Sequence, residues 1–501
     1  MKDAPPLHYD TLRKNRYEGY LLESAPERVL QFGEGNFLRA FADYFIDVAN
    51  EKAGYNGKVV VVQPILQGLA DTINAQEGLY TLYLRGFEAG RPVGSRHIVS
   101  SISRCINPYL AYQDFLHCAH NPDLRIVVSN TTEAGIVFDE TASFDDAPAK
   151  NFPGKLTRLL YERFSVFGGD RRRGLIILSC ELIDDNGKEL KQCVLRHCAQ
   201  WGLEQAFIAW LDDANLFCST LVDRITTGYP KDEAAALNEE NGYADKLLDA
   251  AEPFGLWVIE GPAWLAEELP FARAGLPVIV CDDQTPYKRR KVRILNGAHT
   301  SMSLGAYLAG KDFVRDCVED DVICRYIHAL IFEEIIPTLT LPEQALKDFA
   351  LSVIERFRNP FIDHSLLAIA LNSTAKWKAR VLPSVKAYAA RFHKIPALLL
   401  FSFAAYAKFY SGAARSGDTV VGRRGDETYA IADDAFVLSF FLEHAKDSAG
   451  ALIRALCRNA QMWDEDLSQI PGFEESALAA FTLMEEKGLY EAIRTVSGGA
   501  L

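Results

Sequence analysis

Long apolar segments are missing from this chain of 501 residues. No run of 18 or more apolar residues occurs, which is the length that a membrane-spanning helix requires. The first residues, MKDAPPLHYDTLRKNRYEG, also lack the apolar segment of a secretory signal. We therefore expect a cytoplasmic protein without a membrane partner.

Basic residues are in the minority. The 53 Lys and Arg residues stand against 67 Asp and Glu residues, which gives a net charge of -14. A surface that binds nucleic acid carries an excess of positive charge, so we expect no nucleic-acid partner. An anionic ligand would need a local basic pocket.

Paired cysteines are absent as well. The ten cysteines are scattered with no C-x-x-C pair, a distribution that indicates reduced core residues rather than a disulfide framework. His117, Cys118 and His120 cluster in the sequence, but no second cluster completes the four ligands of a zinc site. We expect no metal.

A strand, a glycine turn and a helix open the chain's first recognisable unit. Residues 28–32 (RVLQF) predict a strand, followed by GEGNFLRA and an apolar-periodic helix to about Asn50. Gly33 suits a tight turn, and Gly35 allows a pyrophosphate to approach the N–H groups of the helix start. Leu38 occupies the place of the third glycine of G-x-G-x-x-G, so the motif alone is a weak sign of dinucleotide binding.

The next strand bears on the choice of cofactor. Residues 58–64 (KVVVVQP) predict a buried strand, and Gln63 stands at its end, where such folds carry an acidic residue for the ribose. From Gln63 to Asp71 there is no Arg or Lys to bind a 2′-phosphate. NAD is therefore favoured over NADP.

Polar residues follow a third strand at residues 124–129. Ligands of open α/β sheets bind beyond the carboxyl ends of the strands, so we expect these polar residues to meet the nicotinamide riboside. A capped turn at a helix start explains them nearly as well. The four residues are Asn130, Thr131, Thr132 and Glu133.

The second half of the chain has helical periodicity throughout, for example at residues 321–336, 342–357 and 395–407. Residues 410–430, rich in Gly, Ser, Arg and Asp, predict a mobile loop. The fold class expected is an α/β Rossmann-like N-terminal domain, residues 1–283, followed by an all-α C-terminal domain, residues 284–501.

Reactive side chains gather in residues 282–301, DDQTPYKRRKVRILNGAHTS. Pro286 favours a helix start, and we predict one helix from Tyr287 to about Leu308. At 3.6 residues per turn, Lys291, His299 and Asn296 would lie at roughly 0°, 80° and 140° around its axis. A lysine can transfer a proton to a carbonyl or alcohol oxygen while the amide and imidazole donate to it. A solvated basic face with a local Asn-Gly break is the alternative.

These motifs resemble the long-chain mannitol dehydrogenase family of zinc-independent polyol and uronate oxidoreductases. KVRILNGAH is similar to its K-x4-N-x2-H signature, and GEGNFLRA matches its G-x-G-x-F-x-R-A form. The resemblance implies that Lys291 is the general acid/base, Asn296 part of the oxyanion site and His299 a substrate-positioning group. It also implies NAD contacts at Asn36 and Phe37.

One segment departs from the polyol-oxidising members. They read S-C-D-N where this chain has Ser179, Cys180, Glu181 and Leu182, so the second oxyanion asparagine is missing. They also carry an acidic residue three positions before the lysine, where Lys288 stands here.

Both departures point to an anionic substrate. The members with S/P-C-E-L reduce a keto-uronate, tagaturonate, to altronate. Lys288, Lys376 and Arg380 could bind the carboxylate, although Lys376 and Arg380 could also be a solvated pair. Asp223 and Arg224 could line the substrate cleft or form a buried structural ion pair. Fructuronate or mannitol chemistry, an NAD-retaining epimerase and a non-catalytic NAD sensor are the alternatives.

Overall fold

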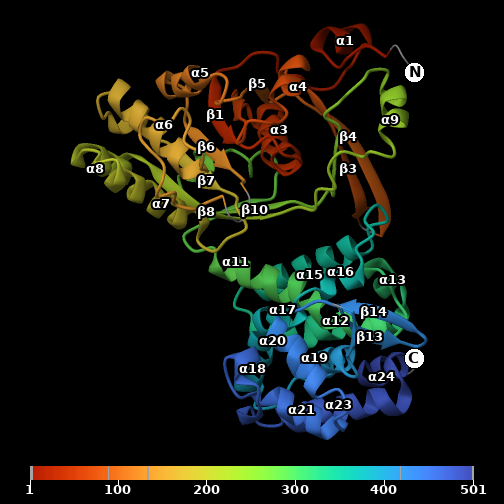
Figure 1. The fold of residues 1–501 in the computed structure, drawn as a ribbon. Helices are drawn as coiled ribbons and strands as arrows, with labels where there is room; N and C mark the ends of the chain where they lie inside the picture. The colour runs from red at the N-terminus through yellow and green to blue at the C-terminus, as the bar shows by residue number, and fades with distance from the viewer. Residues whose placement is uncertain (1–3, 89, 132–134, 418, 499–501) are drawn as a thin grey trace. The chain divides into compact units, whose positions relative to one another are not determined.

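The computed structural model describes residues 4–88, 90–131, 135–417 and 419–498. The chain folds as two compact units, coloured red to green and green to blue in Figure 1. The first comprises Met1–Gly86 and Val93–Gln284, and the second comprises Phe87–Pro92 and Thr285–Leu501.

An eight-stranded sheet with order β11-β10-β8-β7-β6-β1-β2-β5 forms the centre of the first unit. The six strands from β5 to β8 are parallel, and β10 joins antiparallel to β8. This is the doubly wound order of dinucleotide-binding folds, and it confirms the predicted Rossmann-like domain. The strands are β1 Glu27–Phe32, β2 Lys58–Val62, β5 Ile102–Ile106, β6 Ile126–Ser129, β7 Ile176–Ser179, β8 Leu216–Asp223, β10 Leu256–Glu260 and β11 Val278–Cys281.

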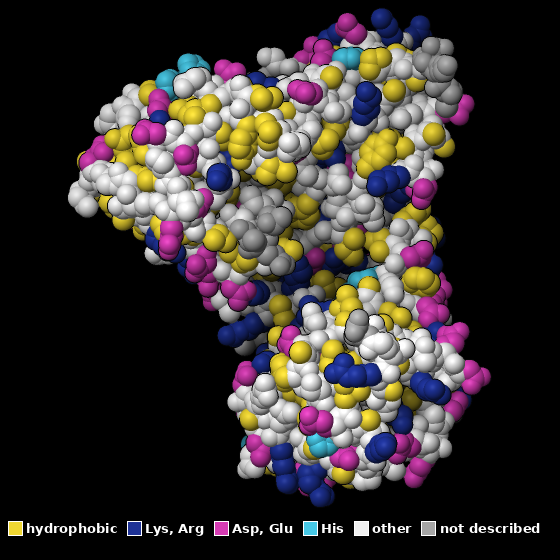
Figure 2. All heavy atoms as spheres, in the orientation of Figure 1, with side chains coloured by type: hydrophobic (Ala, Val, Ile, Leu, Met, Phe, Trp, Pro, Cys, Tyr) yellow, Lys and Arg dark blue, Asp and Glu magenta, His cyan; other side chains and the backbone are white. Residues whose placement is uncertain are grey.

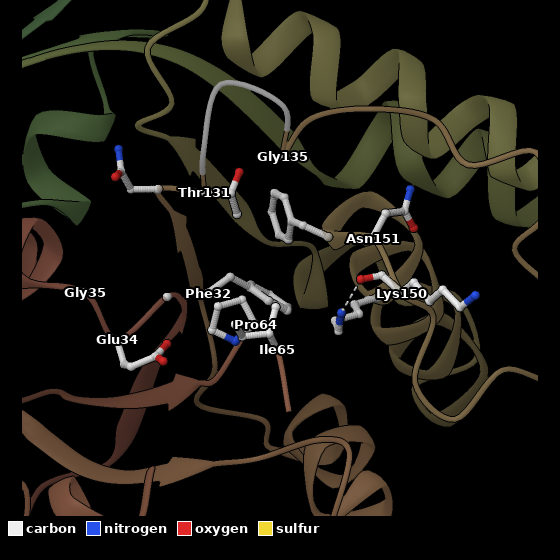
Figure 3. A pocket seen from close by; sticks show the side chains of 13 residues that line it. Phe32, Glu34, Gly35, Pro64, Ile65, Thr131, Gly135, Lys150 and Asn151 are labelled. Carbon is white, nitrogen blue, oxygen red and sulfur yellow. Dashed lines mark hydrogen bonds between the residues drawn. The ribbon is translucent and has the colours of Figure 1, made fainter. Parts of the chain in front are cut away.

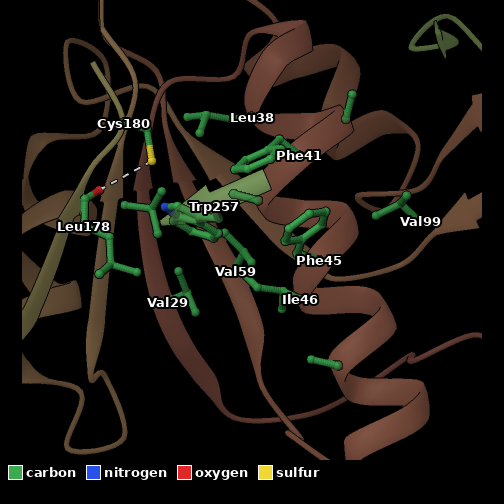
Figure 4. Close-up of a cluster of buried hydrophobic side chains, with 14 of the residues drawn as sticks. Val29, Leu38, Phe41, Phe45, Ile46, Val59, Val99, Leu178, Cys180 and Trp257 are labelled. Atoms are coloured by element: carbon green, nitrogen blue, oxygen red, sulfur yellow. Dashed lines mark hydrogen bonds between the residues drawn. The ribbon is translucent and has the colours of Figure 1, made fainter. Parts of the chain in front are cut away.

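Helices cover both faces of this sheet, which explains the unbroken valine run of β2. Val59 and Val61 belong to one buried cluster, which Figure 4 shows around Phe41, Phe45 and Trp257. The other valines of the run lie in a second cluster with side chains of α6 and α7. The helices of this unit are α1 Tyr9–Lys14, α2 Asn36–Leu38, η1 Arg39–Asp43, α3 Tyr44–Ala53, α4 Ala70–Ala75, α5 Tyr112–His117, η2 Cys118–His120, α6 Phe152–Val166, η3 Arg171–Arg173, α7 Asn186–Gln200, α8 Gln205–Ala214, α9 Ala234–Asn241 and α10 Leu265–Glu268.

A small sheet of order β4-β3-β9 completes the strands of the N-terminal half, with β3 Tyr80–Glu88, β4 Arg91–Val99 and β9 Asp249–Ala251. On the face of the first unit that Figure 2 shows, basic and acidic side chains are interspersed. The absence of a nucleic-acid partner stays a prediction from charge.

The second unit is helical, as predicted. Its central helix is α19, which is buried nearly all round and packs against α12. The helices are α11 Thr285–Arg290, η4 Lys291–Asn296, α12 Gly297–Leu308, α13 Val314–Glu319, α14 Asp321–Ala329, η5 Leu330–Ile335, η6 Ile336–Thr338, α15 Glu343–Phe357, α16 Leu366–Ala370, α17 Ser373–Arg380, α18 Leu382–Phe392, α19 Ala397–Tyr410, α20 Ala435–Glu443, α21 Ala449–Cys457, α22 Ala460–Trp463, η7 Leu467–Gln469, α23 Phe473–Lys487 and α24 Leu489–Val496.

The prediction of a mobile loop at residues 410–430 is wrong. This segment forms an antiparallel sheet of β12 Ala414–Ser416, β13 Thr419–Arg424 and β14 Glu427–Ile431. Val420, Tyr429 and Ile431 are buried, whereas Thr419, Thr428 and Ala430 are exposed. The strand alternation is present, but the Gly, Arg and Asp residues of the tight turns conceal it in the composition.

The ten cysteines are all free, as predicted, and eight of them are buried. Among the described residues no group of three or more His, Cys, Asp or Glu side chains is arranged to hold a metal ion. None of the helices in the described part of the chain combines the length and apolar character needed to cross a membrane.

Candidate active site

The glycine turn lies at the carboxyl end of β1. Gly33 has a φ of 119°, a value that side chains with a Cβ rarely adopt. A Cβ there would lie 3.3 Å from Leu38 Cδ1 and 3.4 Å from the Asn130 carbonyl oxygen. Gly35 is the N-cap of α2, and a Cβ built on it meets nothing within 4 Å. Space is therefore left open above the first N–H groups of the helix.

That space belongs to a cavity of about 490 Å³ at the carboxyl ends of the strands. Figure 3 shows Glu34, Gly35 and Thr131 on one side of it, Lys150 and Asn151 on the other, and aromatic and aliphatic groups between them. It is lined by Phe32, Gly33, Glu34, Gly35, Pro64, Ile65, Asn130, Thr131, Gly135, Lys150, Asn151, Phe152 and Lys155. An apolar floor beside a glycine turn and a helix start fits the adenosine and diphosphate of a dinucleotide.

The structure gives the predicted cofactor residues different environments. Asn36 is exposed and accepts a hydrogen bond from Arg39 Nη2, whereas Phe37 stacks on Phe41 with ring centroids 5.1 Å apart. Gln63 is buried, and its amide donates to the carbonyls of Ile65 and Leu66 and accepts from the N–H of Ala70. It thus fixes the loop after β2 rather than lining the cavity.

Asn130 and Thr131 line the cavity, while Thr132 and Glu133 lie outside the described residues. The Glu181 carboxylate accepts from the backbone N–H and the hydroxyl of Thr131, each at 3.1 Å, and from the Ser129 hydroxyl at 3.2 Å. Burial raises the pKa of Glu181. The residue that replaces the aspartate of S-C-D-N therefore ties the ends of β6 and β7 together.

Leu182, which stands in place of the asparagine, is 67% exposed and offers no donor to an oxyanion. Arg224, after β8, donates to the carbonyls of Ala40, Pro253 and Phe254 and lies against the rings of Phe41, Tyr44 and Phe45. These contacts support the structural alternative for Arg224. Asp223, the residue before Arg224, is also buried.

In the second unit the reactive stretch is not one regular α-helix, so the angular spacing predicted from 3.6 residues per turn is wrong. Lys291–Asn296 is a π-helical segment between α11 and α12. The Gly297 N–H donates to the Val292 carbonyl five residues earlier, the bond that defines a π turn. Lys291 and Asn296 are also five residues apart. Because a π turn has this spacing, the two residues lie about one turn apart on the same side of the segment. Such π segments are frequent at functional sites.

His299 occupies the first turn of α12. Its ring stacks on Phe357 at a centroid distance of 4.3 Å and meets His364 edge-on at 5.0 Å. Burial, together with the charges of His364, Arg356 and Arg380, holds the pKa of His299 well below its ordinary value. Its Nε2 is buried without a hydrogen-bond partner among the described residues. A neutral imidazole with an unused nitrogen is suited to contact a substrate hydroxyl or carbonyl oxygen.

Two arginines from separate helices act on His299, Arg356 of α15 and Arg380 of α17, and Lys376 of α17 acts on the neighbouring His364. Arg380, at the end of α17, reaches Thr300 Oγ1 at 3.5 Å, and Lys376 donates to the Ile369 carbonyl at 2.8 Å. Burial first, and then the Arg380 charge, lower the pKa of Lys376. Arg356 and His364 are the two ends of the segment RFRNPFIDH. No site role was predicted for them, because they approach His299 only through the packing of α15 and the following loop.

Comparison with known proteins matches nearly the whole chain. The model of the mannitol dehydrogenase Rossmann domain matches residues 27–273, and that of the mannitol dehydrogenase C-terminal domain matches residues 283–484. Altronate oxidoreductases of Escherichia coli O7:K1 and Shigella flexneri are 47% identical to it over 476 residues, covering 94% of this chain and 96% of theirs.

Solved structures share the fold. Substrate-free D-sorbitol dehydrogenase superposes with a TM-score of 0.78 at 22% identity over 94% of this chain and 96% of its own. Pseudomonas fluorescens mannitol 2-dehydrogenase, in a ternary complex with NAD and D-mannitol, gives a TM-score of 0.66 at 21% identity over 98% and 99%. The matches to both domain models and the extent of the 47% identity establish that this chain is a dehydrogenase belonging to the mannitol dehydrogenase family.

Proposed function

We propose that the protein is an NAD-dependent secondary-alcohol dehydrogenase that reduces the keto-uronate tagaturonate to altronate. The observation that carries the substrate class is the pair of arginines beside His299, since the charges of Arg356 and Arg380 both act on the buried imidazole. A neutral polyol would not require that charge. The altronate oxidoreductase name of relatives 47% identical to this chain supports the same substrate.

The residues that would hold the cofactor are those of the cavity in the first unit. The Gly33–Gly35 turn and the start of α2 would receive the diphosphate, and Asn130 and Thr131 would lie toward the nicotinamide riboside. When bound, NADH supplies the hydride. Two lysines line the cavity, exposed Lys150 and buried Lys155, but the loop after β2 carries no cation for a 2′-phosphate.

The groups of the second unit would handle the proton and the oxygen. Lys291 would donate a proton to the carbonyl oxygen as it becomes a hydroxyl, and the Asn296 amide would donate a hydrogen bond to the same oxygen. His299 would contact the same oxygen through Nε2. Its neutral ring would add no further positive charge to the site. Lys288, Lys376 and Arg380 would bind the carboxylate by charge-assisted hydrogen bonds.

Initial rates with a panel of substrates, followed by NADH absorbance, test this proposal. We expect tagaturonate to be reduced far faster than fructuronate or fructose, with one NADH consumed per altronate formed. A preference for fructuronate or mannitol would identify that compound, rather than tagaturonate, as the substrate. Conversion without net NADH consumption would indicate an epimerase, and NADH binding without turnover of any uronate or polyol would indicate a sensor.

A further inference from the structure

A buried lysine lines the cofactor cavity without an acidic partner. Lys155 lies in the first turn of α6 and is 2% exposed. Its Nζ donates to the Tyr109 hydroxyl at 3.1 Å and to the Lys150 carbonyl at 2.8 Å, the dashed line in Figure 3. An ammonium group has three N–H donors. Within the described chain, one donor of Lys155 is therefore unused.

No carboxylate of the described residues lies within ion-pair distance of Lys155, and burial lowers its pKa to about 8. A buried ammonium without a counter-charge destabilises a fold. Lys58, at the start of β2, is a useful contrast. It is similarly buried with a pKa of about 8, but the charges of Asp47, Glu23 and Glu27 act against the larger effect of burial.

The remainder of the cavity also favours an anion. Asn151 caps the 15-residue helix α6, so the N-terminal end of this helix faces the same space as the Gly33–Gly35 turn and the start of α2. Glu34 is the one acidic side chain among the described residues of the lining, and burial raises its pKa. A ligand that brings its own negative charge would supply the partner that Lys155 lacks.

We propose that Lys155 is the cation that holds the diphosphate of the dinucleotide in this cavity. The assignment rests on the proposed use of NADH. It adds a side-chain contact to a site otherwise formed by backbone N–H groups. It also gives a reason for a buried charge that has no acidic partner among the described residues.

Isothermal titration of the apoprotein with NADH, ADP-ribose and adenosine tests the proposal. Lys155→Met should weaken NADH and ADP-ribose about tenfold to a hundredfold, as the loss of one charge-assisted hydrogen bond implies, and leave adenosine nearly unchanged. Lys58→Met is the matched control, because it removes an equally buried lysine at the opposite ends of the strands. It should leave all three affinities unchanged.

Thermal shifts separate binding from folding. NADH should raise the Tm of Lys155→Met less than that of wild type, and Lys155→Arg should recover part of the lost affinity. Lys155→Gln, which keeps a side-chain N–H, provides a second neutral variant and should behave as Lys155→Met does.

Three outcomes would overturn the assignment. Unchanged NADH affinity in both neutral variants would leave Lys155 a structural group only. A larger loss for NADPH than for NADH would mean that Lys155 contacts a 2′-phosphate instead of the diphosphate. Wild-type protein that binds no NADH would instead refute the proposed function itself, and the inference would fail with it.

Discussion

The candidate cofactor cavity and the candidate catalytic cluster are built in opposite ways. In the first unit the part expected to bind the diphosphate is a glycine turn with an open Gly35 and two helix starts, beside an apolar floor. In the second unit the candidate catalytic cluster is mainly side chains, with His299 among cations brought from separate helices. A backbone site should tolerate many substitutions but no added bulk. A side-chain site should fail when a single functional group is removed.

Removing the proton-transfer group should give the largest effect. Lys291→Ala should lower kcat by about 10²–10⁴, the usual contribution of a general acid/base, while NADH affinity stays near wild type because the cavity lies in the other unit. Single-turnover rates and NADH titration measure the two quantities. Lys347→Ala, which removes a partly exposed lysine paired with Glu343 in the same unit, should leave both unchanged. Retention of a tenth of wild-type kcat would remove Lys291 from this role.

Adding bulk to the backbone site is the converse test. Gly35→Val would fill open space with an ordinary backbone conformation, φ -67° and ψ 163°, so the fold should persist. We expect NADH affinity to fall about tenfold to a hundredfold through lost diphosphate contacts. Gly94→Val on β4, where a Cβ also meets nothing within 4 Å, is the control. Equal NADH affinity in the two variants would place the diphosphate elsewhere.

Charge in the second unit should set substrate choice. Arg380→Ala should lower kcat/KM for the uronate about tenfold to a hundredfold, since a charge-assisted hydrogen bond contributes about 1.5–3 kcal/mol, and should affect fructose little. Lys288→Glu should also lower the ratio of kcat/KM for the uronate to kcat/KM for fructose. Lys378→Ala, on the same helix but paired with Asp464, should not. An unchanged ratio in Arg380→Ala and Lys288→Glu would make both residues part of a solvated basic face.

Features that depend on contacts between residues close in the sequence could be predicted, whereas features that depend on distant contacts could not. The strand, glycine turn and helix around Gly33 depend on neighbouring residues, and the structure has them where the pattern predicts. The Rossmann-like and helical domains were predictable because buried strands and amphipathic helices leave periodic patterns. The π turn at Lys291–Asn296 was not, since its side chains have no period that differs clearly from an α-helix over six residues.

Long-range contacts set the limit for the candidate site. Arg356 and His364 reach His299 through tertiary packing, and Lys155 faces the cavity because α6 begins there. Their local sequence does not show that the fold brings them to a site. Gln63 shows the reverse case, because its position at the strand end suggested a ligand contact whereas its amide holds the following loop.

The relative use of NADH and NADPH tests whether a side chain of the cavity binds the 2′-phosphate. We expect kcat/KM for NADH to exceed that for NADPH by about tenfold or more, because one unmet charged contact costs at least 1.4 kcal/mol. The motive is the lack of a basic residue between Gln63 and Asp71. Exposed Lys150, on the cavity's other side, is the residue to replace if the two cofactors are used equally.

The smallest effect expected is a pH dependence with opposite signs for binding and folding. The pKa of Lys155 is about 8 in the folded protein against about 10.4 in an unfolded chain. Since the unfolded chain keeps this proton to higher pH, the contribution of Lys155 to stability should rise between about pH 8 and 10. NADH affinity should instead fall, by a few-fold up to tenfold from pH 7 to 9, as the ammonium loses its charge. Lys155 contacts the Tyr109 hydroxyl and the Lys150 carbonyl, and the titratable side chains of Lys150 and Glu34 line the same cavity.

Titrating NADH at several pH values and unfolding the apoprotein in urea at the same values would reveal the two slopes. Lys155→Met should flatten the decline in affinity. Lys58→Met should change only the stability profile, because its amine, also with a pKa of about 8, lies at the amino end of β2 away from the cavity. A decline in NADH affinity that persists in Lys155→Met would assign the titration to another group, and the positive charge that binds the diphosphate would then come from the helix starts and Lys150.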